Sequence, residues 1–220
     1  MNKIKLTFLL FLFASVMDII GIILKTPMLI YVFKPLIIIA LLFLYVFSLP
    51  KRLKWYVIAL EFSFFGDVLL MFSGKLFFMA GLLSFLMAHI LFIKIVINQI
   101  KKTSILKVII ASVPFLMLFL GLMFVLRNSL NELLIPVIIY GLTISTFGVV
   151  SLINYLQKKS VKSFLMLVGA VVFITSDSLL AINKFYNPNK IFEVLIMVTY
   201  IVAQYLIFKS MVLSPKKVKS

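Results

Sequence analysis

The sequence predicts an all-α membrane protein, a polytopic bundle of eight transmembrane helices in a single domain, 1–220. First, the 220 residues are 64% hydrophobic with a mean hydropathy of +1.25, whereas soluble domains are about half apolar. Second, only 13% of the residues are charged. Third, the apolar residues form continuous runs of the ~20 residues that a helix needs to cross a bilayer. Continuous runs favour helices over the alternating strands of a barrel.

Eight such runs follow one another along the chain, separated by short basic or polar segments. The predicted spans are 6–24, 28–48, 54–73, 76–97, 104–126, 132–156, 162–182 and 192–213. The first run follows two lysines, as in a signal peptide. No small-residue cleavage site comes after it, so we interpret it as a retained first helix.

The basic residues between the runs test this count, because cytoplasmic loops are enriched in Lys and Arg. With eight helices, one side of the membrane receives Lys3, Lys5, Lys51, Arg52, Lys54, Lys101, Lys102, Lys107, Lys158, Lys159, Lys162, Lys216, Lys217 and Lys219. The other side receives Lys25, Lys75, Arg127, Lys184 and Lys190. The excess on the first side predicts that both termini are cytoplasmic. It also explains the net charge of +16 by membrane topology, so we expect no nucleic-acid partner.

Residue usage limits the chemistry. The chain has no cysteine, which excludes disulfides and thiolate metal ligands, and its one histidine, His89, excludes a multi-histidine centre within the chain. We therefore predict neither a metal nor a cofactor. The abundance of Lys, Ile, Asn and Phe suggests an AT-rich bacterial genome, and hence a multi-pass protein of the cytoplasmic (inner) membrane.

Three pairs of segments suggest an internal repeat. "KPLIII" (34–39) aligns with "IPVIIY" (135–140), "FFGDVLL" (64–70) with "ITSDSLL" (174–180), and "LMAHILF" (86–92) with "IVAQYLI" (201–207). The order is the same in both halves, and helices four apart share a direction. This pattern favours a parallel four-plus-four repeat about an axis along the membrane normal.

Polar groups gather toward one side of the predicted bundle. A charge at the bilayer centre costs at least about 2.5–3.5 kcal/mol on insertion scales, so such groups are expected to face a shared interior cavity. Asp67 and Asp177 lie at similar heights in the third and seventh helices. The supporting candidates are Lys34 before Pro35, Ser63 one turn before Asp67, His89 and Tyr200 near mid-depth, Gln204 one turn after Tyr200, and Asn183 at the outer mouth.

Each candidate also has a purely structural interpretation. Asp67 and Asp177 could hold helices together by pairing with Lys34 or with serine hydroxyls, and His89 could be a packing residue. Glu61 lies about 120° around the helix from Asp67 and faces another neighbour unless it supports the site. Asp18 and Glu193, nearer to helix ends, are expected to be solvated.

Five segments in order resemble the YhhN-type lysoplasmalogenase-like membrane proteins. They are "FKPLIII" (33–39), "FSFFGDVLLM" (62–71), "FFMAGLLSFLMAHILF" (77–92), "GAVVFITSDSLLAINKF" (169–185) and "TYIVAQYLIFKS" (199–210). The resemblance implies an eight-helix hydrolase that cleaves the vinyl ether bond of a lysophospholipid, a lysoplasmalogen, to a fatty aldehyde and a glycerophospho-ethanolamine or -choline. It also implies that Asp67 and Asp177 are the functional aspartates, that His89 is the family's histidine, and that Asn183, Tyr200 and Gln204 support them.

Paired carboxyls suit this reaction. Protonation of the vinyl ether β-carbon gives an oxocarbenium ion that water captures, much as in glycoside hydrolysis. One proton shared between Asp67 and Asp177 would supply the acid and the base together. Lys34, Lys184 or Lys190 could bind the lipid phosphate, and the chain would run between helices toward the membrane lipids.

Other functions fit the same residues. Intramembrane Asp and Lys also mark the pathways of transporters and lipid-translocating proteins. A hydrolase of another lysolipid is a further alternative, as is a metal-dependent lipid hydrolase that uses His89 with Asp67 and Asp177.

Overall fold

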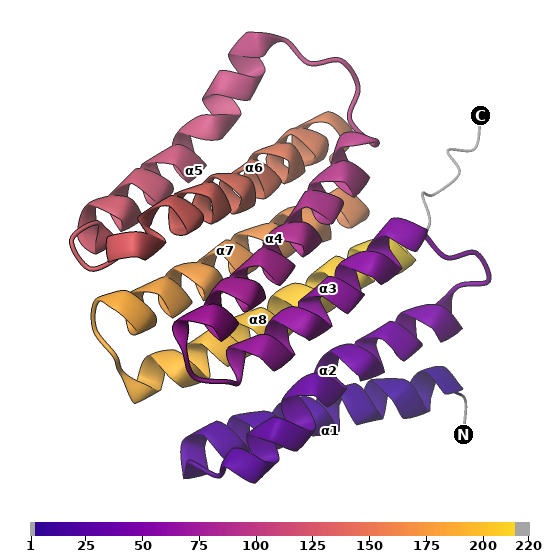
Figure 1. Cartoon of the computed structure of the whole chain (residues 1–220). Coiled ribbons are helices and arrows are strands. Elements are labelled where there is room, and N and C mark those ends of the chain that lie inside the picture. Colours follow the sequence, from indigo (N-terminus) through magenta and orange to yellow (C-terminus); the bar gives the residue numbers. More distant parts are fainter. Residues whose placement is uncertain (1–2, 214–220) are drawn as a thin grey trace.

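The computed structural model describes residues 3–213, and this part of the chain is helical without a strand. The helices are α1 (Lys3–Leu24), α2 (Pro27–Ser48), α3 (Lys54–Leu70), α4 (Lys75–Ile97), α5 (Ile105–Leu126), the short 3-10 helix η1 (Asn131–Leu133), α6 (Leu134–Lys158), α7 (Val161–Phe185) and α8 (Lys190–Val212) (Figure 1). The all-α prediction is confirmed. The basic residues Lys216, Lys217 and Lys219 lie outside the described residues.

Seven of the helices in residues 3–213 are long and apolar enough to cross a bilayer, which makes this a multi-pass membrane protein. The exception is α3, whose 17 residues extend about 25 Å at 1.5 Å per residue. It ends at Leu70 rather than at 73, where it was predicted to end. The chain turns there through Gly74, whose φ of 115° suits glycine because it has no Cβ. That α3 also spans the membrane stays a prediction.

Consecutive helices pack as antiparallel hairpins, with α1 on α2, α3 on α4 and α7 on α8. Helix α6 joins the hairpins by contacting α4, α5 and α7, while α8 contacts α1 and α2. Helix α5 lies at one edge of the bundle, and the α1–α2 hairpin lies at the opposite edge (Figure 1). Helices α3, α4, α6, α7 and α8 therefore surround the centre.

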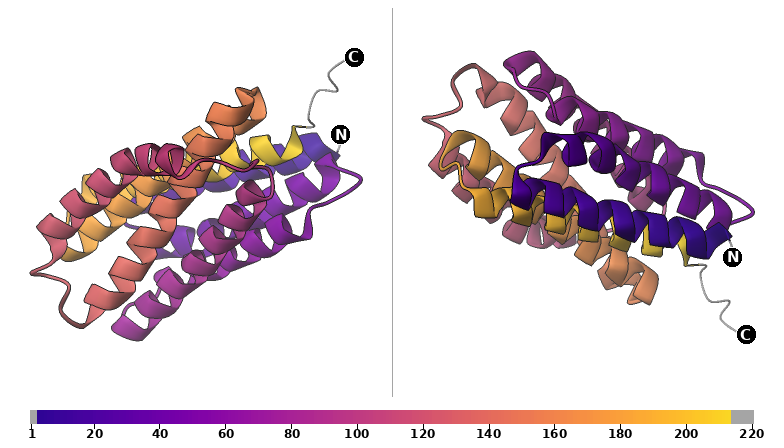
Figure 2. Two further views of the ribbon diagram at one scale, coloured as in Figure 1. Left: turned by 90° about the horizontal axis from the view of Figure 1, so that it is seen from above. Right: turned by 90° about the horizontal axis from the view of Figure 1, so that it is seen from below.

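Helix α1 begins and α8 ends at the same end of the bundle (Figure 2). This is the end that carries most of the basic residues and the one predicted to be cytoplasmic. The placement of that end in the cytoplasm, the four-plus-four repeat and the single-domain boundary stay predictions.

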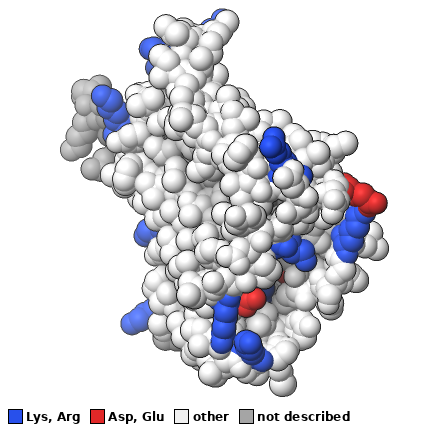
Figure 3. Space-filling view, turned by 90° about the vertical axis from the view of Figure 1, so that its left-hand side faces the viewer, with Lys and Arg blue, Asp and Glu red and all other residues white. Residues whose placement is uncertain are grey.

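The outer surface is apolar, as expected for contact with lipid. Helix α5 buries Ala111, Phe115, Phe119 and Leu126 and exposes most of its other large apolar side chains. Most of the surface seen in Figure 3 carries no charged side chain. The core is rich in aromatic rings, and these lie around the polar groups described next.

Candidate functional site

A buried hydrogen-bonded chain joins α3 to α8. The Tyr200 hydroxyl donates to Oδ2 of Asp67 over 2.6 Å, and Nε2 of Gln204 donates to the Tyr200 hydroxyl over 3.3 Å. All three side chains are buried. Because Tyr200 and Gln204 are one helical turn apart, they share the face of α8 that packs against the interior. The structure therefore brings together three of the predicted site residues.

A second tyrosine forms a hydrogen bond with the second aspartate. The Tyr140 hydroxyl of α6 donates to Oδ2 of Asp177 on α7 over 2.5 Å. Asp177 is only partly buried and lines a cavity of about 40 Å³ between α5, α6 and α7, together with Tyr140 and Ser178. Its environment thus differs from that of Asp67, which is 2% exposed.

The two carboxyls interact electrostatically, but in residues 3–213 no hydrogen bond joins them directly. Each is bonded to its own tyrosine instead. That one proton is shared between Asp67 and Asp177 stays a prediction. The observed unit is two Tyr–Asp pairs.

An aromatic layer separates the two pairs. The Phe173 ring lies 5.5 Å from that of Tyr200 and 4.6 Å from that of His89, measured between centroids. Phe85 closes the layer at 5.8 Å from Tyr200. These rings exclude water from the Asp67 side of the site, and a dry environment strengthens the electrostatic interactions inside it.

His89 belongs to this layer rather than to the carboxyl pairs. It is fully buried and its ring contacts four aromatic rings, those of Phe92, Tyr140, Phe147 and Phe173. Neither ring nitrogen makes a hydrogen bond of good geometry, although the Phe85 carbonyl one turn earlier interacts with it. The arrangement places the predicted supporting residue His89 beside the Tyr140 ring, 5.7 Å away.

A glycine on α3 allows the layer to approach Asp67. A Cβ added at Gly66 would lie 2.6 Å from the Phe85 ring of α4. One at Gly81 of α4 would meet Leu70 at 2.7 Å. The two helices can pack closely only because both positions lack a side chain.

The burial of Asp18 differs from the prediction. It was expected to be solvated near a helix end, yet it is fully buried on α1 with no hydrogen-bond partner for either carboxylate oxygen. Lys34 of α2 interacts electrostatically with both Asp18 and Asp67, and it forms no ion pair within 4 Å in residues 3–213. The interior thus holds a third carboxyl, which depth along the chain did not reveal because packing of α2 and α8 on α1 covers it.

Three other expected residues lie outside the carboxyl network. The Ser63 hydroxyl is buried but donates to the Ala59 carbonyl one turn back, 3.0 Å away. Asn183 accepts from the backbone N–H of Asn189 over 2.7 Å and so braces the turn between α7 and α8. Lys190, one of the three lysines expected to bind phosphate, donates to the Ile23 carbonyl at the end of α1 over 2.7 Å.

Glu61 points away from the site. Its side chain is exposed in an apolar groove between α2 and α3, beside Ile38 and Phe65. Glu193 is exposed at the start of α8, as expected.

Tyr140 was not among the predicted residues, although it ends the segment 135–140 that suggested a repeat. The sequence signal that could have identified Tyr140 is the residue type itself, because a buried tyrosine hydroxyl needs a polar partner. Within residues 3–213, no three His, Cys, Asp or Glu side chains lie close enough together to hold a metal ion.

Comparison with known proteins identifies the family of this chain. The model of the YhhN family matches residues 29–211, which include α3–α7 and nearly all of α2 and α8, so the chain belongs to the YhhN family. Searches of curated proteins and of solved structures gave no match. The match includes both Tyr–Asp pairs and begins after α1, which carries Asp18.

Proposed function

We propose that this YhhN-family membrane protein is a hydrolase that cleaves the vinyl ether bond of lysoplasmalogens. The products are a fatty aldehyde and a glycerophospho-ethanolamine or -choline. The main support is the contrast between the two carboxyls, one bordering a small cavity and one sealed behind aromatic rings. Two carboxyls in different environments suit separate roles in acid–base catalysis.

Asp177 is the general acid in this proposal. Its Oδ2 accepts the Tyr140 hydroxyl, so the proton to be transferred resides on Oδ1. That proton moves to the β-carbon of the vinyl ether, and the electron pair of the double bond forms the new C–H bond. The ether oxygen stabilises the resulting cation as an oxocarbenium ion. The hydrogen bond from Tyr140 then stabilises the carboxylate that Asp177 has become.

The same carboxylate next serves as the base. A cavity of about 40 Å³ beside Asp177 has room for water, which needs roughly 10–15 Å³ of such space. The water oxygen bonds to the oxocarbenium carbon and its proton returns to Asp177, giving a hemiacetal. Collapse of the hemiacetal transfers the hydroxyl proton to a base and a proton to the leaving oxygen, which releases the aldehyde and the glycerol hydroxyl.

Asp67 stabilises the positive charge of the intermediate. It is fixed by Tyr200 and Gln204 and interacts with the charge of Lys34, which is a counter-charge for a buried carboxylate. Groups fixed in advance around a developing charge are among the largest contributors to enzyme catalysis. Phe173 and Phe85 keep bulk water from screening this interaction.

The test is aldehyde release from a synthetic lysoplasmalogen by purified protein. Asp177→Asn and Asp67→Asn should each lower turnover by about 100-fold or more, the usual scale for loss of an acid–base group. The matched control is Glu193→Gln, which neutralises an exposed carboxylate on α8 and should leave turnover unchanged. Retention of most of the activity by either Asn variant, folded by size-exclusion chromatography, would rule out the two-carboxylate mechanism.

A further inference from the structure

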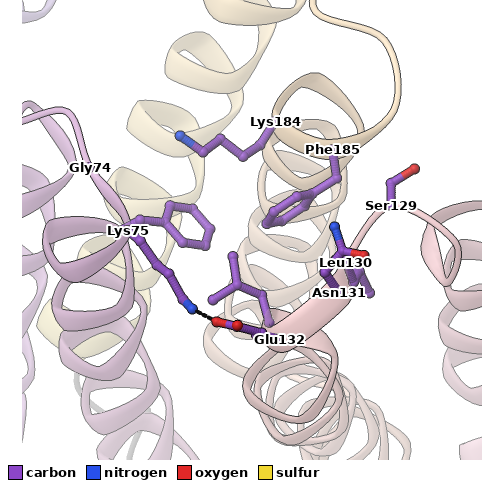
Figure 4. Close-up of a pocket in the computed structure, with 10 residues that line it drawn as sticks. Gly74, Lys75, Ser129, Leu130, Asn131, Glu132, Lys184 and Phe185 are labelled. Carbon is purple, nitrogen blue, oxygen red and sulfur yellow. Dashed lines mark hydrogen bonds and ion pairs between the residues drawn. The ribbon is translucent and has the colours of Figure 1, made fainter.

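A charged vestibule opens where α4 and α6 begin and α7 ends. This cavity of about 600 Å³ is lined by Lys75, Phe78, Ser129, Asn131, Glu132 and Lys184, among others. Lys75 of α4 forms an ion pair with Glu132 of η1, and Lys184 extends from the end of α7 on the same side (Figure 4). Its Nζ lies 5.2 Å from the centroid of the Phe78 ring. The vestibule therefore presents both signs of charge.

An apolar groove of about 430 Å³ lies between α4 and α6. Leu76, Leu83 and Leu86 line its α4 side, and Pro136, Ile139 and Tyr140 line its α6 side. Several lining side chains are widely exposed, Leu76 at 77% and Leu83 at 59%, so the groove opens toward the lipid. Its volume lies within the roughly 300–1,000 Å³ of typical small-molecule sites.

The vestibule and the groove adjoin each other along α4, and the groove shares Tyr140 with the candidate site. Lys75 lines the vestibule and its neighbour Leu76 lines the groove. Tyr140, whose hydroxyl is bonded to Asp177, also lines the groove. Tyr140 is six residues into α6, about 9 Å from its start at 1.5 Å per residue. Tyr140 also lines the small cavity that Asp177 borders, so a polar opening, an apolar groove and the Tyr140–Asp177 pair follow one another over a short distance.

We infer that the vestibule and groove bind a single-chain phospholipid with a zwitterionic headgroup. The phosphate lies between Lys184 and Lys75, the ammonium lies on Glu132, and the hydrocarbon chain lies in the α4–α6 groove. Glu132 determines which headgroups bind, because its carboxylate repels a headgroup that carries only negative charge. The single groove fits one chain. The link to catalysis rests on the proposed function, since the bond next to the glycerol is then the one that reaches Tyr140 and Asp177.

The binding test uses a lipid that cannot be hydrolysed, a 1-O-alkyl lysophosphoethanolamine, titrated into the purified protein in detergent. Lys184→Gln should weaken its binding by at least tenfold. Lys25→Gln, the matched control at the exposed α1–α2 turn of the same end, should not. Glu132→Gln should weaken binding of the ethanolamine lipid but leave or strengthen binding of the 1-O-alkyl lysophosphatidic acid, which lacks the ammonium. Equal affinities for Lys184→Gln and Lys25→Gln, or an unchanged headgroup preference in Glu132→Gln, would overturn the inference.

The position of the chain is tested with the same lipid carrying a photoactivatable diazirine in mid-chain. Mass spectrometry should find the cross-links on α4 and α6 peptides that line the groove. Leu83→Trp should reduce them severalfold, whereas Leu116→Trp on the exposed face of α5 should not. Cross-links confined to other helices would overturn the assignment of the groove.

The experiments distinguish failure of the proposed hydrolysis from failure of the proposed lipid-binding site. Binding and labelling as expected without aldehyde release would contradict the proposed hydrolysis alone. Aldehyde release with labelling elsewhere would contradict the vestibule and groove alone.

Discussion

At the scale of single residues, the site is organised by tyrosine hydroxyls. Asp67 and Asp177 each accept a hydrogen bond from a tyrosine on a different helix, so neither carboxyl relies on its own helix for a partner. A buried carboxyl without such a bond would cost free energy. The two Tyr–Asp pairs are therefore both the structural support of the aspartates and a means of orienting them.

Tyr200→Phe tests this role, because it removes one hydroxyl and keeps the ring that packs on Phe173 and Phe85. We expect turnover of the lysoplasmalogen to fall about tenfold, which corresponds to a loss of 1.4 kcal/mol of transition-state stabilisation. Thermal stability in detergent should change little by comparison.

The control for that substitution is Tyr205→Phe on the same helix. The Tyr205 ring packs against Phe8 and Phe11 of α1, away from both aspartates. Turnover should stay at the wild-type level. Equal losses in the two variants would indicate that the Tyr200 hydroxyl has no specific role.

The sequence predicted Asp67, Asp177, Tyr200 and Gln204, because polar residues inside apolar runs are conspicuous. Tyr140 and Asp18 were missed for different reasons. A tyrosine within an apolar run resembles a packing residue, and burial of Asp18 depends on how α2 and α8 cover α1. The outward direction of Glu61 likewise depends on helix rotation, which charge alone does not determine.

At the scale of helices, the apolar runs predicted most ends to within a few residues, because the bilayer length limits each run. The largest differences at the C-terminal ends are in two helices: α7 continues to Phe185 instead of 182, and α3 ends at Leu70 instead of 73. Apolar residues continue to Phe72, but the chain turns before Gly74, which adopts a positive φ. Hydropathy alone does not register such a turn.

The α3–α4 contact gives a prediction at this scale. Gly66→Ala would place a Cβ 2.6 Å from the Phe85 ring and displace that ring from its place beside Tyr200. Overpacking of this kind typically costs about 1–3 kcal/mol. We expect a lower Tm in detergent together with reduced turnover.

Gly121→Ala is the matched control, since an added Cβ there meets nothing within 4 Å and alanine favours the helix. Its Tm should equal or exceed that of the wild type. A Gly66→Ala protein as stable and active as Gly121→Ala would mean that close packing at Gly66 does not position the aromatic layer.

At the scale of the whole molecule, the distribution of basic residues predicts that the end of the bundle where α1 begins faces the cytoplasm. The absence of cysteine allows single-cysteine labelling on an otherwise unreactive background. With a membrane-impermeant maleimide on intact cells, Ser73→Cys and Asn187→Cys should be labelled. Lys51→Cys and Lys102→Cys should react only after permeabilisation.

This labelling also decides whether α3 spans the membrane. Lys51 precedes α3 and Ser73 follows it, so a spanning α3 puts the two cysteines on opposite sides. If Ser73→Cys were protected like Lys51→Cys, α3 would not cross, and the predicted count of eight spans would be wrong.

The central claim is that a carboxyl protonates the β-carbon of a lysolipid vinyl ether. The most direct measurement is the mass of the fatty aldehyde released by the purified protein in D₂O, trapped at once to prevent exchange. The account predicts one deuterium, on the carbon next to the carbonyl, and no such product from Asp177→Asn. Aldehyde without that deuterium, or no aldehyde from folded wild-type protein, would contradict it.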